Sequence, residues 1–436
     1  MEAQTNHTEA WYQRRAELVP RGLGIFSPAT AVSAKGALVW DADGREFIDF
    51  AGGIGVLNAG HCPDSVVAAI QEQAGKLLHT CFNVAVYAPY LDLAEKLVEL
   101  LPHGGPTKVM LTNSGAESVE NAIKIARQAT GRPAVICYEG AFHGRTMMAM
   151  SLTSKVGYKS GCGPFAPEVY RLPFPHYRPS AGISESEFGS QQLDVLRRFF
   201  HTGVAANQVA AIIVEVVQGE GGFQVISPTY LKGLRQLCDA EGILLILDEV
   251  QSGFGRTGAW AAYEHFGVIP DLSTWAKSMG SGMPIGCVMG KASIMDAAAP
   301  GTIGGTYPGN PVCAAAALAT LRYMEDIDIN ALGQKIGAVV RQRFESMQAR
   351  FPHCIAAVHG LGAMCAIELV LPDGQPATAL TRDILHYANQ HGLILINAGV
   401  NGNYIRVLSP LVISTEHLER GLDIIEHALQ HHAPCA

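Results

Sequence analysis

The 436-residue sequence has no long apolar run, no block of basic residues and no Cys-x-x-Cys pair. A helix needs about 18 consecutive apolar residues to cross a bilayer, so we expect no membrane span. The net charge of −8, without a basic cluster, argues against nucleic acid or an anionic membrane as the main partner. Hydrophobic residues make up 48% and charged residues 16%, which suits a large globular core.

Patterns typical of metal sites and disulfide frameworks are also missing. The ten cysteines are scattered, and the sixteen histidines include no His-Glu-x-x-His. We therefore expect no metal site and no disulfide framework. The first ten residues lack the hydrophobic core of a signal peptide, and together with the cysteine usage this favours a reduced, cytoplasmic setting.

Two short runs that lead into charged residues stand out in the middle of the chain. The aliphatic run 242–247 leads into Asp248, and the short run 272–276 leads into Lys277. Both runs are typical of buried strands, and ligands of open α/β sheets bind at the C-terminal ends of strands. We therefore expect the carboxylate and the amine to face one crevice. Pyridoxal 5'-phosphate (PLP) needs such a pair, because a lysine forms a Schiff base with its aldehyde and a carboxylate keeps its ring nitrogen protonated.

A strand, a turn of small residues and a helix follow one another at 108–130. The strand 108–113 runs into Ser114, Gly115 and Ala116, where the helix begins. Free backbone N–H groups at a helix N-terminus, together with the Ser114 hydroxyl, suit a phosphate. An ordinary helix start is the alternative interpretation.

Two further strand ends carry residues that suit a ligand. Strand 134–138 is followed by Phe142, which can stack on a planar ring, and by Arg145, whose guanidinium can bind a carboxylate. Strand 209–215 is followed by Glu220, which stands between glycines. A site role and a plain turn both remain open for Glu220. Residues 157–181, which are dense in proline and glycine, are expected to be irregular.

The order of elements predicts an α/β fold with a second, smaller domain. Strand–helix–strand units between 108 and 290 predict right-handed crossovers and a mostly parallel sheet. We predict an N-terminal arm with part of the small domain at 1–60, a large PLP-binding domain at 61–325 and a small α+β domain at 326–436.

Several stretches resemble the class III (ω-amino) aminotransferases, which are PLP enzymes of fold type I. They are residues 113–122, 142–146, 248–258 and 276–278. Within that family the chain is most similar to 4-aminobutyrate (GABA) aminotransferases, through residues 49–61, 217–222 and 404–408. The resemblance implies a transaminase that moves the terminal amino group of GABA to 2-oxoglutarate and gives succinate semialdehyde and glutamate. The alternative donors are 5-aminovalerate and ornithine-type amines.

The resemblance also implies a role for each site residue. Lys277 and Asp248 would be catalytic, and further cofactor contacts would come from Ser114, Gly115, Ala116, Phe142, His143, Val250, Gln251 and, in a partner subunit, Thr306. The substrate would be bound by Ile54, Arg145, Glu220 and Arg406. Arg145 would bind the distal carboxylate and Arg406 the α-carboxylate of 2-oxoglutarate. Glu220 would neutralise Arg406 when the donor lacks that carboxylate. A homodimer or a dimer of dimers is expected.

Three alternatives were weighed against this interpretation. The pattern Gly-x-Gly-x-x-Gly at 253–258 would suit a dinucleotide, but no acid stands between 272 and 294, where the ribose would need one. An aminomutase or racemase of the same fold would not need the pair Glu220 and Arg406, and a binding protein would not need Lys277. Val216, where related sequences usually carry proline, and the bulky Trp275 leave the chain length of the substrate open.

Overall fold

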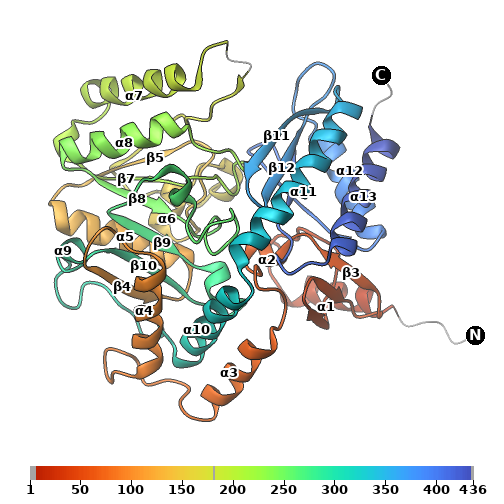
Figure 1. Cartoon of the computed structure of the whole chain (residues 1–436), viewed down its shortest axis with the longest axis horizontal. Helices are drawn as coiled ribbons and strands as arrows, with labels where there is room; N and C mark the ends of the chain where they lie inside the picture. The colour runs from red at the N-terminus through yellow and green to blue at the C-terminus, as the bar shows by residue number, and fades with distance from the viewer. Residues whose placement is uncertain (1–5, 180–181, 434–436) are drawn as a thin grey trace, which may run out of the picture.

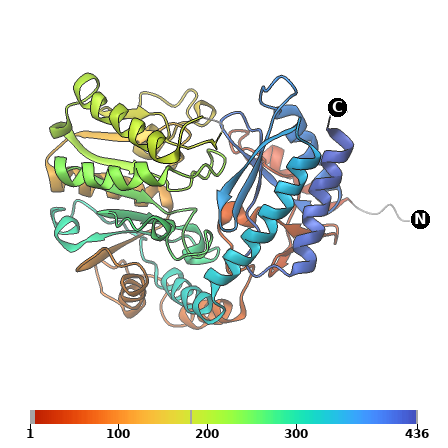
Figure 2. The same ribbon diagram turned by 45° about the horizontal axis from the view of Figure 1, so that its top comes forward.

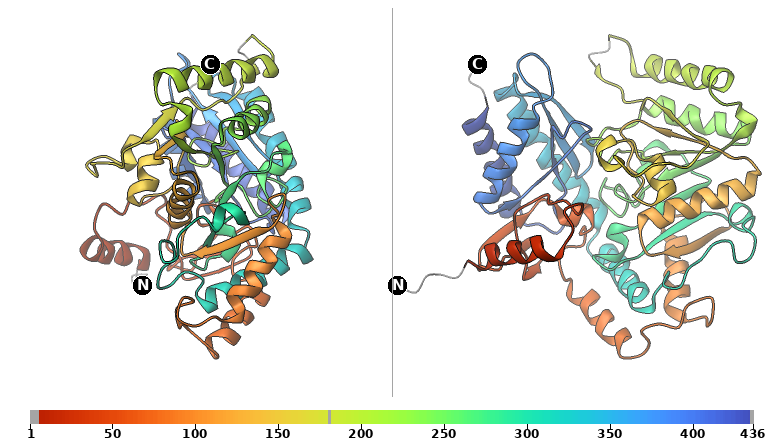
Figure 3. Two further views of the ribbon diagram at one scale, coloured as in Figure 1. Left: turned by 90° about the vertical axis from the view of Figure 1, so that its left-hand side faces the viewer. Right: turned by 180° about the vertical axis from the view of Figure 1, so that it is seen from behind.

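The chain folds into two lobes, as the computed structural model shows for residues 6–179 and 182–433 (Figure 1). The larger lobe is built on a seven-stranded sheet, and the smaller lobe contains two four-stranded sheets. Figure 2 and Figure 3 show the same division from other directions, with the N-terminal and C-terminal segments together in the smaller lobe. No helix in the described ranges is long and apolar enough to span a membrane.

The seven-stranded sheet is mostly parallel, because only β10 runs against its neighbours β4 and β9. Its strands, in spatial order, are β4 (Thr107–Thr112), β10 (Gly286–Lys291), β9 (Leu272–Trp275), β8 (Leu244–Asp248), β7 (Val209–Val214), β5 (Ala134–Tyr138) and β6 (Val169–Leu172). The predicted α/β fold with a mostly parallel sheet is confirmed. The prediction of an irregular segment at 157–181 was wrong for β6, an edge strand that is only half-buried and therefore shows no apolar run.

Strand β7 explains how the core is divided between the two faces of this sheet. Successive side chains of a strand point to opposite faces. Ala211 and Ile213 pack with α5 (Gly115–Thr130), whereas Ile212 and Val214 pack in the cluster that includes α8 (Pro228–Glu241). Burial of each isoleucine side chain stabilises the fold by about 1.5–3 kcal/mol, so a strand that is apolar on both faces belongs at the centre of a covered sheet.

Further helices complete the large lobe. Helix α10 (Pro311–Asp326) packs on α3 (Asp64–Ala74) and α4 (Ala88–Leu100), and α7 (Glu185–Thr202) packs on α8. The short helices are α6 (Met147–Leu152), α9 (Ala292–Met295) and the 3₁₀ turns η1 (Val156–Tyr158), η3 (Ala206–Gln208), η4 (Ala262–Phe266) and η5 (Lys277–Gly280).

The small lobe joins the two ends of the chain. One antiparallel sheet has the order β11 (Ile355–Leu361), β12 (Met364–Leu369), β15 (Tyr404–Val407) and β14 (Ile396–Ala398). The other contains β1 (Ser33–Lys35), β2 (Leu38–Trp40), β3 (Glu46–Asp49) and β13 (Leu393–Ile394). Because β13 pairs with β3, the N-terminal segment shares a sheet with the C-terminal one. The helices of this lobe are α1 (His7–Leu18), α2 (Gly52–Gly55), α11 (Ile329–Arg350), α12 (Thr378–Gln390) and α13 (Thr415–His432).

The glycine pattern at 253–258 lies in a buried turn. A Cβ atom at Gly253 would lie 2.5 Å from the ring of Trp275, and one at Gly255 would lie 2.8 Å from Ile329. These glycines therefore allow close packing around the fully buried Trp275. Their packing role accounts for the glycine pattern without a dinucleotide.

Candidate active site

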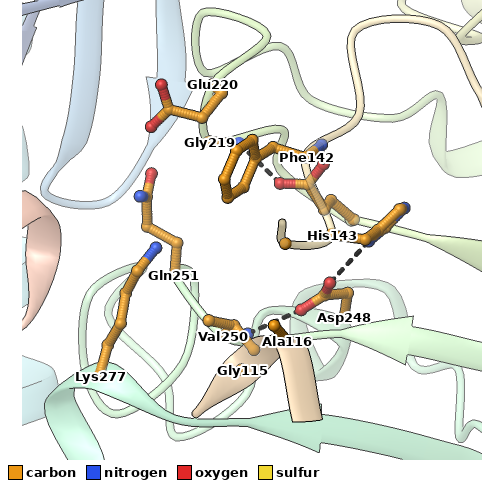
Figure 4. A pocket seen from close by; sticks show the side chains of 12 residues that line it. Gly115, Ala116, Phe142, His143, Gly219, Glu220, Asp248, Val250, Gln251 and Lys277 are labelled. Atoms are coloured by element: carbon orange, nitrogen blue, oxygen red, sulfur yellow. Dashed lines mark hydrogen bonds and ion pairs between the residues drawn. The ribbon is translucent and has the colours of Figure 1, made fainter. Parts of the chain in front are cut away.

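Four strands of the large sheet end beside one cavity of about 190 Å³, whose lining residues are drawn in Figure 4. Parallel strands place their C-terminal ends at one edge of the sheet, and this brings the segments after β5, β7, β8 and β9 together. The cavity is lined by Gly115, Ala116, Phe142, His143, Gly144, Glu215, Gly219, Glu220, Asp248, Val250, Gln251 and Lys277. Nine of the fourteen predicted site residues are among these twelve, and Ser114, Ile54, Arg145, Thr306 and Arg406 are not.

Asp248, the last residue of β8, is held in place by two hydrogen bonds. Its Oδ2 lies 2.7 Å from Nδ1 of His143, and its Oδ1 accepts the backbone N–H of Val250 at 3.1 Å. A carboxylate only accepts hydrogen bonds, so Nδ1 of His143 carries the proton. Nε2 of His143 is buried without a partner in the described part of the chain. The carboxylate therefore has a fixed direction at the floor of the cavity.

Lys277 lies two residues after the end of β9 and has an unusual backbone conformation. Its φ angle is +49°, in the left-handed region that residues other than glycine rarely adopt. Such strain persists where the surrounding structure imposes it, often at functional sites. Burial lowers the pKa of the ammonium, while the charge of Glu220 opposes this effect. A lowered pKa makes the neutral, nucleophilic amine more available.

The N-terminus of α5 forms another wall of the cavity. Ser114 caps the helix, with its Oγ accepting the N–H of Glu117 at 3.2 Å, and Gly115 and Ala116 face the cavity. A Cβ atom at Gly115 would lie 2.8 Å from Cγ1 of Val250, so a larger residue here would force Val250 to move. Backbone N–H groups and the positive end of the helix dipole favour an anion at this wall.

Phe142 links the cavity to Arg145 through an aromatic neighbour, Tyr158. The rings of Phe142 and Tyr158 meet edge to face at 5.3 Å. The guanidinium carbon of Arg145 lies 4.8 Å from the centre of the Tyr158 ring and 5.9 Å from that of Phe142. Arg145 itself is exposed, so its guanidinium is free to meet a carboxylate at the rim.

Glu220 and Arg406 form an ion pair between the two lobes. Oε1 of Glu220 lies 2.7 Å from Nη1 of Arg406, and the two side chains are 15% and 2% exposed. Nε of Arg406 is buried without a hydrogen-bond partner among the described residues. Burial alone would raise the pKa of Glu220, but Arg406 outweighs burial and lowers it. Glu220 is therefore ionised, and the pair is neutral overall.

Two predicted residues lie away from these contacts. Ile54 sits in the glycine-rich turn of α2 with a φ of +70° and packs on the apolar cluster of the small lobe. Thr306 is exposed on the loop before α10. Its predicted role is in the site of a partner subunit, so a position outside the cavity of its own chain fits that role.

Glu215 is a lining residue that the sequence analysis did not identify as part of the site. It follows β7 directly, as Asp248 ends β8, and the charged residue after an apolar strand was the available signal. Its Oε2 accepts the N–H of Phe142 and its Oε1 that of Gly219, both at 3.0 Å. Burial raises the pKa of Glu215 to about 7.

The cavity has the groups that PLP requires. An amine, a carboxylate and an anion-binding helix terminus face it from different walls, at Lys277, Asp248 and Gly115. Phe142 and Val250 offer an aromatic and an aliphatic side chain to a planar ring. The described residues contain no group of three side chains that could hold a metal ion.

Comparisons with known proteins agree with this chemistry. Residues 24–429 match the family described as aminotransferase class-III. The chain is 46% identical to a probable 4-aminobutyrate aminotransferase of Bacillus subtilis, over 97% of this chain and 98% of that protein. It is 47% identical to a 5-aminovalerate aminotransferase of Pseudomonas aeruginosa, over 96% and 97%. The ornithine aminotransferase structure from Toxoplasma gondii matches with a TM-score of 0.85 at 29% identity, over 97% of this chain and 95% of that one.

Proposed function

The chain belongs to the class-III aminotransferase family, and we propose that it transfers the terminal amino group of GABA to 2-oxoglutarate. The products are succinate semialdehyde and glutamate. The observation that carries this proposal is the ion pair of Glu220 and Arg406 beside the cavity that holds Lys277. The 46% identical relative named a probable 4-aminobutyrate aminotransferase supports the choice of donor.

PLP, the cofactor of this family, supplies an aldehyde that takes up the amino group and a ring that withdraws electrons from the reacting carbon. Lys277 provides the amine that holds the cofactor and moves the proton at the reacting carbon of the substrate. Asp248 provides the negative charge that keeps the ring nitrogen protonated, and His143 fixes the direction of that carboxylate. Gly115 and Ala116 offer backbone N–H groups to the phosphate.

The two substrates differ in their number of carboxylates, and the ion pair allows one site to bind both. GABA has one carboxylate, for which Arg145 is the receptor, and Glu220 then neutralises Arg406. 2-Oxoglutarate has a second carboxylate, which replaces Glu220 on Arg406. An unpaired arginine as buried as Arg406 would cost about 3–5 kcal/mol, so a charged partner is needed in the first half of the reaction.

A second donor, 5-aminovalerate, is one methylene longer than GABA. The 47% identical relative from Pseudomonas aeruginosa bears that substrate in its name, so this donor is the main competitor. Both donors carry one carboxylate and would leave Glu220 on Arg406. Chain length alone would separate them, through the distance between Lys277 and Arg145. Ornithine-type amines are the next alternative.

We also infer a homodimer in which Thr306 reaches the phosphate site of the partner subunit. Thr306 is exposed, and so is its neighbour Tyr307, which is stacked on His79. The adjoining loop exposes the apolar side chains of Val84 and Val86. Exposed apolar side chains at this density are typical of an interface. A cytoplasmic location is proposed as well, since the nine described cysteines are all free thiols.

Half-reactions test the donor directly. PLP-saturated protein is mixed with GABA, 5-aminovalerate, ornithine or alanine in the absence of an oxoacid, and the absorbance change from the aldehyde to the amine form of the cofactor is recorded. Fastest conversion by GABA supports the proposal. Faster conversion by 5-aminovalerate or ornithine replaces the donor, and no conversion by any amine contradicts the transaminase. A monomer with full activity in solution would contradict the role of Thr306.

A further inference from the structure

Tyr158 contacts both Arg145 and Glu220, the ion-pair partner of Arg406. Its phenolic oxygen is 3.3 Å from Oε2 of Glu220, while Oε1 of Glu220 is on Arg406. The face of the same ring lies 4.8 Å from the guanidinium carbon of Arg145. One side chain therefore contacts both the movable glutamate and the arginine at the rim.

The phenol donates the hydrogen bond to Glu220. Burial raises the pKa of Tyr158, and the charge of Glu220 raises it further, so the hydroxyl keeps its proton. A bond of 3.3 Å is long for O–H···O, which is usually about 2.7–2.8 Å. Arg406 thus holds the carboxylate more tightly than Tyr158 does while the ion pair is closed. The hydroxyl is free to form a shorter bond once Arg406 is taken by another carboxylate.

The backbone of Glu220 is anchored independently of its side chain. Its carbonyl accepts the N–H of Gly399 at 2.9 Å, and the carbonyl of Gly399 accepts Nζ of Lys155 at 3.1 Å. Nζ of Lys155 also lies 5.4 Å from the centre of the Tyr158 ring. A side-chain rotation of Glu220 away from Arg406 would therefore leave the backbone in place and keep the carboxylate near a hydroxyl and a cation.

We propose that Tyr158 is a positioning residue for the ion-pair exchange: it retains the Glu220 carboxylate while the second carboxylate of the acceptor occupies Arg406. This inference rests on the role proposed above for Glu220 and Arg406. Without a partner, the released carboxylate would stay partly buried and would compete for Arg406. By stabilising the released position, Tyr158 favours dicarboxylates over monocarboxylates at Arg406.

The test is Tyr158→Phe, which removes one hydroxyl and keeps the ring against Arg145 and Phe142. Loss of a hydrogen bond to a charged group predicts a fall of about tenfold in kcat/KM for 2-oxoglutarate. The fall should come from a higher KM. The half-reactions with GABA and with succinate semialdehyde, which leave Glu220 on Arg406, should change less than about twofold. Calorimetry of the PLP-loaded protein should show weaker binding of glutarate and unchanged binding of butyrate.

Two controls separate this role from a structural one. Tyr170, on β6, has a similar hydroxyl, which donates to Glu168 at 3.0 Å. Tyr170→Phe removes that hydroxyl and should change neither half-reaction. In a Glu220→Gln background, Tyr158→Phe should have little further effect on 2-oxoglutarate. Equal losses for both acceptors, or no loss for 2-oxoglutarate, would overturn the proposal for Tyr158. A wild-type protein that does not prefer 2-oxoglutarate to a 2-oxo monocarboxylate such as pyruvate would instead overturn the proposed function.

Discussion

The carboxylate of Glu215 accepts the backbone N–H of Phe142, with 3.0 Å between Oε2 and the nitrogen. Through its other oxygen it also accepts the N–H of Gly219, the residue before Glu220. A single buried carboxyl group thus connects the loop that carries the aromatic side chain with the loop that carries Glu220. Both loops leave the sheet at neighbouring strands, β5 and β7.

Glu215→Gln should impair both loops. The amide group of glutamine would turn a donor toward one of the two backbone N–H groups, and a buried unsatisfied donor costs about 1–3 kcal/mol. We expect a lower free energy of unfolding by that amount and a fall in kcat/KM of about tenfold, through displacement of Phe142 or Glu220. Urea unfolding and steady-state kinetics measure the two effects. Glu345→Gln, at an exposed position of α11, is the control and should change neither.

The free energy of unfolding of the wild type should depend on pH because Glu215 titrates. Burial raises its pKa in the folded state to about 7, above the usual 4.5. The unfolded chain therefore releases this proton first, and the stability that the group provides at low pH is lost as the pH rises through about 7. The difference in unfolding free energy between the wild type and Glu215→Gln should be larger near about pH 5 than near about pH 8. A difference that stays constant between these pH values would show that the folded carboxyl is ionised throughout.

Loading of the apoprotein with PLP should report the ionisation of Lys277. Burial lowers the pKa of its ammonium and Glu220 opposes this, so removing the charge of Glu220 should lower that pKa further. Because the neutral amine reacts, the rate of loading rises with pH through this pKa. In Glu220→Gln the rise should occur at lower pH than in the wild type. Stopped-flow absorbance of apoprotein mixed with PLP gives both profiles, and a shift to higher pH would contradict the assigned interaction.

Gly115→Ala should weaken cofactor binding. The added Cβ would lie 2.8 Å and 3.0 Å from the two methyl groups of Val250, which would have to move. Overpacking of this kind costs about 1–3 kcal/mol, so the Kd for PLP should rise by roughly ten- to a hundredfold. Equilibrium titration of the apoprotein with PLP measures the change. Gly105→Ala, where nothing lies within 4 Å of the new methyl group, should bind PLP as the wild type does.

Local signals explain which parts of the fold and site were predictable from sequence. Asp248 follows an aliphatic run and Lys277 follows a second short predicted strand, and the order of strands and helices predicts the α/β class, which the sheet confirms. Glu215 has the same signal as Asp248, but the glycines on both sides of Glu220 form a stronger local pattern a few residues later. The roles proposed for the site residues remain predictions.

Other features depend on contacts between distant parts of the chain. His143 meets Asp248 across 105 residues, and Tyr158 meets Glu220 across 62, so no local pattern marks either pair. Tyr158 also belongs to a segment rich in glycine and proline, where periodicity gives no information. Its position is fixed by the ring of Phe142 and the charge of Arg145.

Asp271, the residue before β9, should contribute to stability through three partners. Its Oδ1 lies 2.7 Å from Nζ of Lys291, and its Oδ2 lies 2.8 Å from Nη1 of Arg235 and accepts the N–H of Leu245 at 2.8 Å. Burial alone would raise the pKa of this carboxyl, but Arg235 and the other donors outweigh burial and lower it. The group therefore joins α8, β8 and β10 around the start of the strand that leads to Lys277.

Asp271→Asn should lower the free energy of unfolding by about 1.5–3 kcal/mol at neutral pH, because the charged hydrogen bonds to Arg235 and Lys291 are lost, while the half-buried Arg235 keeps Asp239 as a partner. Since the folded pKa of Asp271 is lowered, this contribution is complete above the unfolded pKa of about 3.9 and is lost as the pH falls further. The difference between variant and wild type should accordingly shrink in acid. Asp194→Asn, in the exposed pair with Arg197, should cost less than about 1 kcal/mol. Because Asp271 does not line the cavity, kcat of the folded variant should equal that of the wild type, and a loss of kcat would show that the start of β9 controls the position of Lys277.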